Sequence, residues 1–123
     1  AVPKACPALM RSCKIQKRAA RVGFDWDTAA DTLPKVHEEA DEVLDALKKG
    51  DAPAIAEEIG DLLFACVNAA RKAGVDPELA LAAATQKFTN RFIKMEELIL
   101  SEGGCLSDMT LEQMDSYWDR IKK

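Results

Sequence analysis

Apolar residues recur at intervals of three and four along most of the chain, which is the spacing of amphipathic α-helices. A sustained two-residue alternation rich in Val, Ile, Thr or aromatic residues, which would indicate strands, is nearly absent. The starts and stops of the helical pattern predict five helices, over about residues 7–22, 31–50, 52–74, 76–102 and 110–122. We therefore expect an all-α fold, a bundle of four to five helices.

Short polar residues, proline and glycine mark the predicted helix ends. Asp31 is the expected N-cap of the second helix, because Pro34 is tolerated in a first turn but would break a helix interior. Gly50 ends that helix, and the short turn makes the second and third helices antiparallel neighbours. Thr110 and Gln113 form a capping-box pattern at the start of the last helix.

Each long helix carries an apolar stripe that we expect to face the core. In the second helix the stripe consists of Leu33, Val36, Ala40, Val43, Leu44 and Leu47. In the third helix it consists of Ile55, Ile59, Leu62, Leu63, Cys66 and Ala70. In the fourth helix it consists of Leu81, Ala84, Phe88, Phe92, Met95 and Ile99. These stripes could close within one chain, or part of the surface, including Met95 and residues 98–100, could pack against a second copy.

The composition is that of one globular domain over residues 1–123, with 48% apolar and 31% charged residues. The formal net charge of -4 and the pI near 5.0 give no general attraction to nucleic acid polymers or anionic membranes. An anionic substrate would need a metal or a local basic pocket. No apolar run approaches the roughly 20 residues that cross a bilayer, so we expect a cytoplasmic protein without a nucleic acid or membrane partner.

The four cysteines form no CxxC pair, and the chain has one histidine, His37. The spacing of a structural zinc site is therefore absent, and we interpret the cysteines as free thiols. The chain begins at Ala1 and enters helix-like sequence at once, so we expect it to be part of a longer protein.

Two acidic pairs at helical spacing are the main candidates for chemistry, Glu39 with Glu42 and Glu58 with Asp61. Residues three apart project from the same face of a helix. At about 100° per residue, each pair lies beside one edge of its helix's apolar stripe, and these edges could face each other in an antiparallel hairpin. The hypothesis is a cluster of four carboxylates between the second and third helices.

Such a cluster would suit metal ions, because the small residues Ala46, Ala54 and Ala65 leave room between the helices. Close carboxylates repel one another unless divalent cations hold them together, and hard oxygen ligands favour Mg²⁺ or Mn²⁺. A di-iron site normally uses an ExxH motif on each of two helices, and His37 has no second histidine as a counterpart. The alternative without a metal is two solvated acidic faces, since the chain has 21 acidic residues.

Lys87 and Arg91 are candidate cations for an anionic substrate. They lie four residues apart on the fourth helix and could grip phosphate oxygens, with Arg91 able to bind two at once. Alternatively, they are surface cations with buried stems. Trp26 and Trp118 are platforms that could stack on a base, or ordinary core residues.

Longer motifs connect these residues to a known family. ExxE is followed after about fifteen residues by ExxD, GFDW occupies residues 23–26, EEIGDLLFACVNAARKAG runs from residue 57, and KFTNRF runs from residue 87. In this combination the chain resembles the MazG nucleotide pyrophosphohydrolases over roughly residues 8–122. It most resembles the C-terminal of the two MazG domains in the tandem bacterial protein. Where the family often has Asn before the KF motif, this chain has Thr85, a change that bears on sugar or base preference.

The resemblance implies an all-α NTP pyrophosphatase fold, usually a homodimer, that cuts a nucleoside triphosphate into its monophosphate and pyrophosphate. It implies that Mg²⁺ is held by catalytic residues at positions Glu39, Glu42, Glu58 and Asp61. The family positions that contact the nucleotide match Lys35, Glu38, Glu57, Lys87, Arg91 and Trp118. By this analogy Trp118 stacks on the base, the two cations of the fourth helix hold the triphosphate, and catalytic Glu38 assists proton removal from the attacking water.

Two other functions stay open. A MazG-like half that binds nucleotide or mediates dimerisation without catalysis would still bind magnesium. A purely structural helical bundle would bind none, and charge-neutral replacement of Glu39 or Asp61 would then be harmless or even stabilising.

Overall fold

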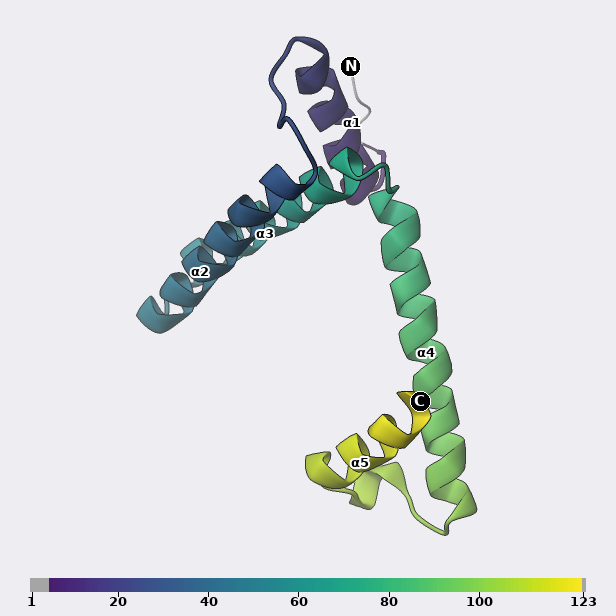
Figure 1. Cartoon of the computed structure of the whole chain (residues 1–123). Helices are drawn as coiled ribbons and strands as arrows, with labels where there is room; N and C mark the ends of the chain where they lie inside the picture. The colour runs from purple at the N-terminus through teal and green to yellow at the C-terminus, as the bar shows by residue number, and fades with distance from the viewer. Residues whose placement is uncertain (1–4, 123) are drawn as a thin grey trace. The chain divides into compact units, whose positions relative to one another are not determined.

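The computed structural model describes residues 5–122, which form five α-helices and two short 3₁₀ turns (Figure 1). No strand occurs among these residues, so the predicted all-α class is confirmed. The chain divides into two compact units, Ala1–Ala80 and Leu81–Lys123, called here the N-terminal and C-terminal units. The single domain over residues 1–123 stays a prediction.

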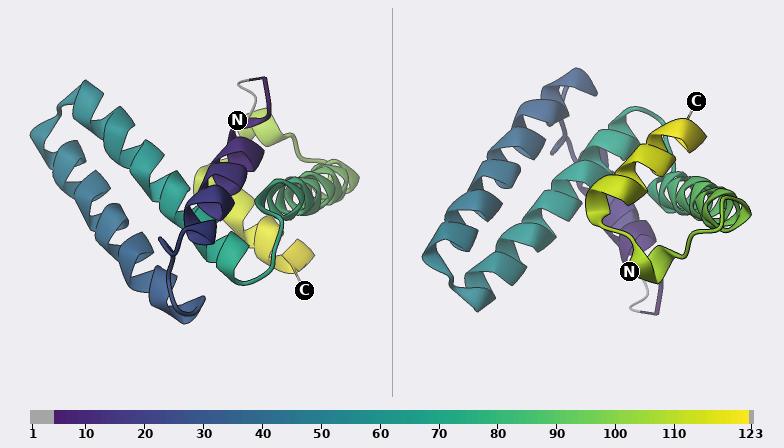
Figure 2. Two further views of the ribbon diagram at one scale, coloured as in Figure 1. Left: turned by 90° about the horizontal axis from the view of Figure 1, so that it is seen from above. Right: turned by 90° about the horizontal axis from the view of Figure 1, so that it is seen from below.

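The N-terminal unit contains α1 (Ala8–Arg21), η1 (Ala30–Thr32), α2 (Leu33–Lys49) and α3 (Ala52–Lys72). Helices α2 and α3 lie side by side as an antiparallel hairpin, and α1 packs across α3 (Figure 2). Helix α2 ends at Gly50, whose φ of 68° lies in the left-handed region that favours glycine. The predicted hairpin is therefore confirmed.

The predicted start of the second helix is wrong. Thr32, not Asp31, is the N-cap of α2, and η1 precedes it. The Asp31 carboxylate instead accepts a hydrogen bond from the Thr28 N–H at 3.1 Å, while the Asp31 N–H donates to the Thr28 hydroxyl at 3.3 Å. The physical reason is that this reciprocal capping begins at Thr28, so helical winding starts before Asp31. Pro34 does lie in the first turn of α2, as predicted.

The stripes predicted to face the core on the second and third helices are largely exposed. Leu47 keeps 55% of its surface exposed and Leu63 keeps 53%. The buried residues are instead Glu39 and Ala46 on α2 and Ala65 and Val67 on α3, none of them more than 6% exposed. Exposed stripe residues also include Leu33, Leu44 and Ile59. Periodicity locates an apolar arc but not the neighbour that covers it, and here the helices meet along an edge of small and acidic residues.

Polar contacts fasten α1 and the segment after it to α3. The Gln16 side-chain amide donates to the Phe64 carbonyl oxygen at 3.0 Å. Asp25 accepts hydrogen bonds from the Arg71 guanidinium and from Lys72 Nζ, the latter at 3.0 Å. Arg71 and Lys72 hold the pKa of the Asp25 carboxyl well below its usual range. The segment between α1 and α2 is therefore anchored on the last turn of α3.

The C-terminal unit contains most of α4 (Pro77–Ser101), then η2 (Leu106–Asp108) and α5 (Leu111–Lys122). The predicted capping box at the start of α5 is confirmed. The Gln113 N–H donates to the Thr110 hydroxyl at 3.2 Å, and the Thr110 N–H donates to Gln113 Oε1 at 2.9 Å.

Burial on α4 is confined to the C-terminal half of its predicted stripe. Met95 and Ile99 are 4% and 0% exposed, whereas Leu81 and Phe88 are 55% and 58% exposed. Met95 is therefore buried, while Leu100 is 67% exposed, and packing of this region against a second copy stays a prediction.

No helix described over residues 5–122 is both long and apolar enough to cross a lipid bilayer. All four cysteines are free thiols, as predicted. Cys13 is buried, while Cys66 and Cys105 are exposed.

Candidate metal centre

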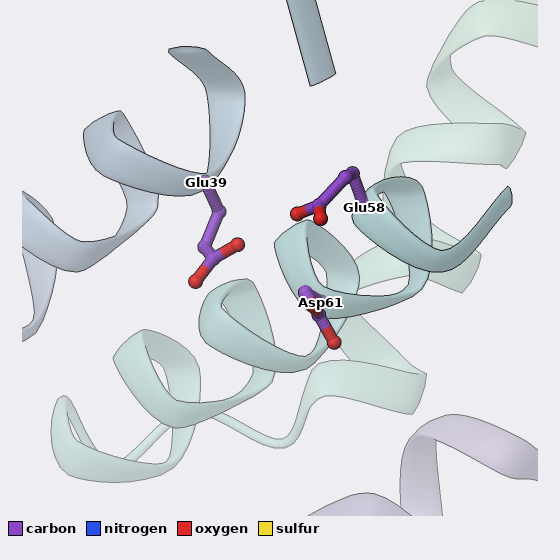
Figure 3. Close-up of side chains that lie close together, drawn as sticks. All are labelled: Glu39, Glu58 and Asp61. Atoms are coloured by element: carbon purple, nitrogen blue, oxygen red, sulfur yellow. The ribbon is translucent and has the colours of Figure 1, made fainter. Parts of the chain in front are cut away.

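Three carboxylates from α2 and α3 converge on one point between those helices (Figure 3). One oxygen from each of Glu39, Glu58 and Asp61 lies within 4.8 Å of the other two. Glu39 is buried, Glu58 is half-buried and Asp61 is exposed. The group therefore lies at the edge of the helix seam and is accessible from solvent, at a spacing that one cation can bridge.

Local structure explains why these acids meet. Glu58 and Asp61 are three residues apart on α3, so both project to the same side of that helix. Glu39 reaches them from α2, because the Gly50 turn folds α2 back along α3. Figure 3 shows Glu39 and Glu58 extending from their helices toward each other, with Asp61 on the next turn. The spacing predicts this convergence, and the catalytic role of the residues stays a prediction.

Lys35 lies beside Glu39, one turn earlier on α2. Its Nζ is 3.0 Å from Glu39 Oε1 and 3.4 Å from Glu38 Oε2. The hydrogen bond from Lys35 lowers the pKa of Glu39, and the same bond raises the pKa of Lys35. The pair is therefore ionised near neutral pH, although Glu39 itself is only 5% exposed.

Glu42 is the fourth acid of the cluster. Its carboxyl group is within hydrogen-bonding reach of Glu39 and Glu58, which raise its pKa to about 7, with Glu39 contributing most. Near neutral pH the cluster therefore keeps a proton that it shares among neighbouring carboxyl groups. A cation beside the other carboxylates would favour the ionised form of Glu42, so the raised pKa is what an acidic site without its counter-charge produces.

Apart from the proton shared with Glu42, two buried oxygens of the cluster, Oε2 of Glu39 and Oε2 of Glu58, accept no hydrogen bond within residues 5–122. Leaving a buried acceptor unpaired is costly, because the group loses its hydrogen bonds to water without replacement. A cation at the point of convergence would supply the missing partner for both oxygens. The residues present therefore fit a bound metal ion.

The donor set of the cluster consists of carboxylate oxygens alone. Such hard ligands suit Mg²⁺, Mn²⁺ and Ca²⁺, whereas zinc sites draw mainly on Cys and His. His37 is exposed on α2 and is not among the converging ligands. The cluster can therefore hold a divalent metal ion, and the di-iron alternative lacks its histidine ligands.

Glu38 and Glu57 flank the cluster without converging on it. The Glu38 side chain is 57% exposed, and one of its oxygens pairs with Lys35. Glu57 is exposed on α3 and projects about 100° away from Glu58 around the helix. Their roles toward substrate stay predictions.

The remaining predicted site residues belong to the C-terminal unit. Lys87 and Arg91 share one face of α4 and line, together with Lys94, an open groove of about 570 Å³. Trp118 packs against Phe88, with ring centroids 5.3 Å apart and planes tilted by 41°. This contact supports the packing role considered for Trp118, and its role toward a nucleotide stays a prediction.

One polar residue that the sequence pattern did not single out is Gln16. It is 5% exposed and lines a cavity together with Trp26. The sequence does place Gln16 on the apolar face of α1. It lies on the same side as Leu9, Cys13 and Ala20, at intervals of four, three and four residues. A polar side chain on such a face is a candidate for a specific hydrogen bond.

Comparison with known proteins adds an independent line of evidence. The family model described as the MazG nucleotide pyrophosphohydrolase domain matches residues 27–95. That span includes the four acids of the cluster together with Lys87 and Arg91.

Two curated relatives match nearly the whole chain, and a third matches about half of it. The nucleoside triphosphate pyrophosphohydrolase of Escherichia coli (strain K12) is 44% identical over an alignment of 124 residues, which covers 99% of this chain and 47% of that protein. The nucleoside triphosphate pyrophosphohydrolase/pyrophosphatase MazG of Thermotoga maritima is 45% identical over 116 residues, 94% of this chain and 44% of that protein. The uncharacterized protein YabN of Bacillus subtilis is 47% identical over 66 residues, 54% of this chain and 14% of that protein. The chain thus spans less than half the length of each relative.

Proposed function

The chain belongs to the MazG family of nucleotide pyrophosphohydrolases, and from this premise we propose that it hydrolyses nucleoside triphosphates to nucleoside monophosphates and pyrophosphate. The observation that carries the proposal is the convergence of Glu39, Glu58 and Asp61 within 4.8 Å, with Glu42 beside them. A cluster of oxygen ligands suits a cation that also binds phosphate oxygens, as divalent ions do in enzymes that act on nucleotides.

The proposed natural ion is Mg²⁺, with Mn²⁺ able to substitute. Its proposed ligands are Glu39, Glu42, Glu58 and Asp61. Bound there, the ion would polarise phosphate oxygens and lower the pKa of water. The unpaired oxygens of Glu39 and Glu58 and the raised pKa of Glu42 support this assignment.

In the proposed reaction a water oxygen forms a bond to the α-phosphorus while the bond from that phosphorus to the α–β bridging oxygen breaks, and pyrophosphate leaves. Glu38 is the proposed acceptor of the water proton, because its side chain is exposed and adjoins the cluster. Lys35 keeps Glu39 ionised and is proposed to contact the phosphates as well.

The proposed phosphate-binding residues outside the cluster are Lys87 and Arg91. A chain with a net charge of -4 needs local positive charge to attract a triphosphate, and these two residues line one groove with a third cation, Lys94. The Arg91 guanidinium can hold two phosphate oxygens in a fork. Glu57 and Trp118 are proposed to contact the nucleoside.

We further propose that the functional form is a homodimer. Leu63 and Ile59 on α3 are 53% and 41% exposed, and a Cβ added to Gly60 between them would have no described atom within 4 Å apart from its chain neighbours and the nearby backbone of α3. Glycine inside a helix costs about 0.5–1 kcal/mol relative to alanine, so its presence suggests that another backbone approaches closely here.

Light scattering coupled to size-exclusion chromatography tests the dimer. The wild type should have the mass of two chains and Leu63→Glu the mass of one, because the new charge would be buried in the interface. Leu79→Glu is the matched control, since Leu79 is 69% exposed at the start of α4. A wild type with the mass of one chain would contradict the proposed dimer.

The short span of the match, 47% of the Escherichia coli relative, favours one alternative. The chain would then be a non-catalytic half that binds nucleotide or mediates dimerisation. This alternative predicts that the chain binds Mg²⁺ and nucleotide without turnover, whereas the hypothesis of a purely structural bundle predicts that it binds neither.

Release of pyrophosphate and monophosphate from a panel of canonical and modified nucleoside triphosphates tests the proposed function. Wild type should release both with Mg²⁺ and neither with chelator, and Glu58→Gln should lower the rate about 100-fold or more. Asp41→Asn is the matched control, because Asp41 is an exposed acid next to Glu42. Mg²⁺ binding without turnover of any substrate would favour the non-catalytic half, and equal rates with chelator would contradict the metal requirement.

A further inference from the structure

Helix α1 differs in charge from the rest of the chain. It contains five cations and no acid, whereas the whole chain has 17 Lys and Arg against 21 Asp and Glu. The five cations are Arg11, Lys14, Lys17, Arg18 and Arg21. At about 100° per residue they fall within an arc of about 120°, so one face of α1 is strongly basic. In a protein with a net charge of -4, such a face attracts anions locally.

Part of this basic face borders a pocket of about 470 Å³. The pocket lies within the N-terminal unit, between α1 and the turn that joins α3 to α4. Its volume is within the roughly 300–1,000 Å³ typical of small-molecule sites. Lys14 and Lys17 reach its wall from neighbouring positions on α1, and Arg71 reaches it from the last turn of α3. Three cations therefore line one concave surface, a shape that strengthens their field.

The positive charge of the pocket is not neutralised by its surroundings. Lys14 and Lys17 are exposed, and none of the ion pairs found among residues 5–122 involves either of them. Asp76 is the one acid among the described residues that line the pocket. Its Oδ1 accepts hydrogen bonds from the N–H groups of Glu78 at 2.9 Å and Leu79 at 3.3 Å, so it caps the start of α4. The lining therefore keeps a surplus of positive charge.

Arg71 adds a buried donor that the fold does not use. Its side chain is only 8% exposed. Its Nη groups bond to Asp25 and Asn68, whereas its Nε–H has no hydrogen-bond partner within the part of the chain that the structure describes. A buried donor without an acceptor is costly, and an oxyanion against the guanidinium would supply one. This observation points to a ligand independently of the exposed lysines.

The rest of the pocket wall is mainly apolar. Met10 contributes from α1, and Val75 and Pro77 contribute from the turn before α4 and its first residue. Apolar walls with a few convergent charged groups are typical of sites for small organic ligands. A phosphorylated small molecule would match both parts, with its phosphate at the cations and its organic part against the apolar wall.

The pocket is separate from the acidic cluster between α2 and α3. Arg71 follows Asp61 by ten residues along α3, which corresponds to about 15 Å of rise. None of the three converging acids lines the pocket. An anion bound beside Arg71 is therefore held by side chains alone and needs no metal ion.

We propose that this pocket is a second anion site, which binds the phosphate group of a small molecule through Lys14, Lys17 and Arg71. The phosphate is either a free ion or part of an organic ester, because the same three cations would recognise both. The proposed hydrolysis of nucleotides does not require this site, and the site does not require hydrolysis.

Nuclear magnetic resonance of the ¹⁵N-labelled chain locates the site. The metal-free protein, in chelator and about 0.15 M salt to screen exposed charges, is titrated with inorganic phosphate and with phenyl phosphate. Sodium chloride at matched ionic strength is the control. The amide signals of Lys14, Lys17, Gly74 and Val75 should shift and saturate with the phosphates and not with chloride.

The two phosphates distinguish the sources of the ligand. Tighter binding of phenyl phosphate would support the site and identify an organic ester, since the ring gains the apolar wall. Equal affinities would support the site and identify the free ion. Shifts confined to residues 87–94, or no saturable shift at all, would overturn the proposal.

Charge-removing substitutions test the assigned residues. Lys14→Gln and Lys17→Gln should each weaken binding of the phosphate probes about five-fold, the order of one charge-assisted hydrogen bond at an exposed position. Arg18→Gln is the matched control, because Arg18 is exposed on the same helix and does not line the pocket. Equal losses in all three variants, or unchanged affinity in both lysine variants, would overturn the proposal. All three side chains are exposed, so the variants should fold, and binding is measured without turnover.

Discussion

Glu42 should make the metal-free protein less stable as the pH rises. An ion-paired acid, whose pKa is lowered, has the opposite effect. Glu39 and Glu58 raise its pKa in the folded protein from the ordinary value of 4.5 to about 7. Between these values the folded chain retains a proton that the unfolded chain has released. The contribution of this group to stability is therefore fully present below pH 4.5 and is lost as the pH rises through 7.

The size of the proton difference follows from the two pKa values of Glu42. At pH 5.75, midway between them, about 95% of folded chains and about 5% of unfolded chains carry the Glu42 proton. Folding at this pH therefore takes up close to one proton at this residue. At pH 7 about half of the folded chains still carry it.

Thermal unfolding of wild type and Glu42→Gln, followed by circular dichroism in chelator from pH 4.5 to 7.5, measures this effect. Glutamine keeps the shape of the side chain but cannot ionise, so the Tm of wild type should fall relative to that of the variant as the pH rises. Excess Mg²⁺ should reverse the order at pH 7.5, because only the complete site gains stability from the ion. A Tm difference that is constant over this range, or that changes with the opposite slope, would refute the reasoning.

Two further predictions concern the frame around the site. Asp25→Asn should lower Tm at neutral pH, and the loss should be constant above about pH 5. The difference should shrink below pH 3.8, the ordinary pKa of the carboxyl group. The reason is that the wild-type carboxyl loses its charge and its pairing with Arg71 as the pH falls through its lowered pKa in the folded protein. Thermal melts from pH 2 to 7 measure this, and a difference that grows in acid would count against the anchor. Gly104→Ala should lower the free energy of unfolding by about 1–3 kcal/mol, because its Cβ would lie 3.0 Å from Met109 Cε and 3.1 Å from Cγ2 of the fully buried Ile99. Urea unfolding measures the change, and an unaltered midpoint would contradict the packing.

The parts of the site that depend on local geometry could be predicted from the sequence. Gly50 and its neighbours specify the tight turn, and the three-residue spacing of Glu58 and Asp61 places both on one side of α3. Once the turn makes α2 and α3 antiparallel, Glu39 can meet them. Both inferences use short-range rules that tertiary context seldom overrides.

The parts that depend on tertiary packing could not be predicted. Leu47 and Leu63 belong to clear apolar stripes, yet each is more than half exposed, because periodicity does not reveal which arc meets which helix. Thr28 and Asp31 cap each other one turn before α2, and the N-cap of α2 falls on Thr32, because local patterns place a helix start only to within one or two residues. The cavity at Gln16 joins α1 to α3, and only a three-dimensional structure reveals such a pairing.

Direct binding of Mn²⁺ to the metal-free protein tests the central claim, that the acids between α2 and α3 form a divalent metal site. The electron paramagnetic resonance signal of free Mn²⁺ is followed while protein is added. Wild type and Asp41→Asn should bind the ion equally, and Asp61→Asn should bind it at least about ten-fold more weakly, since it loses one of the converging ligands. Equal binding by wild type and Asp61→Asn, or no binding by wild type, would contradict the account.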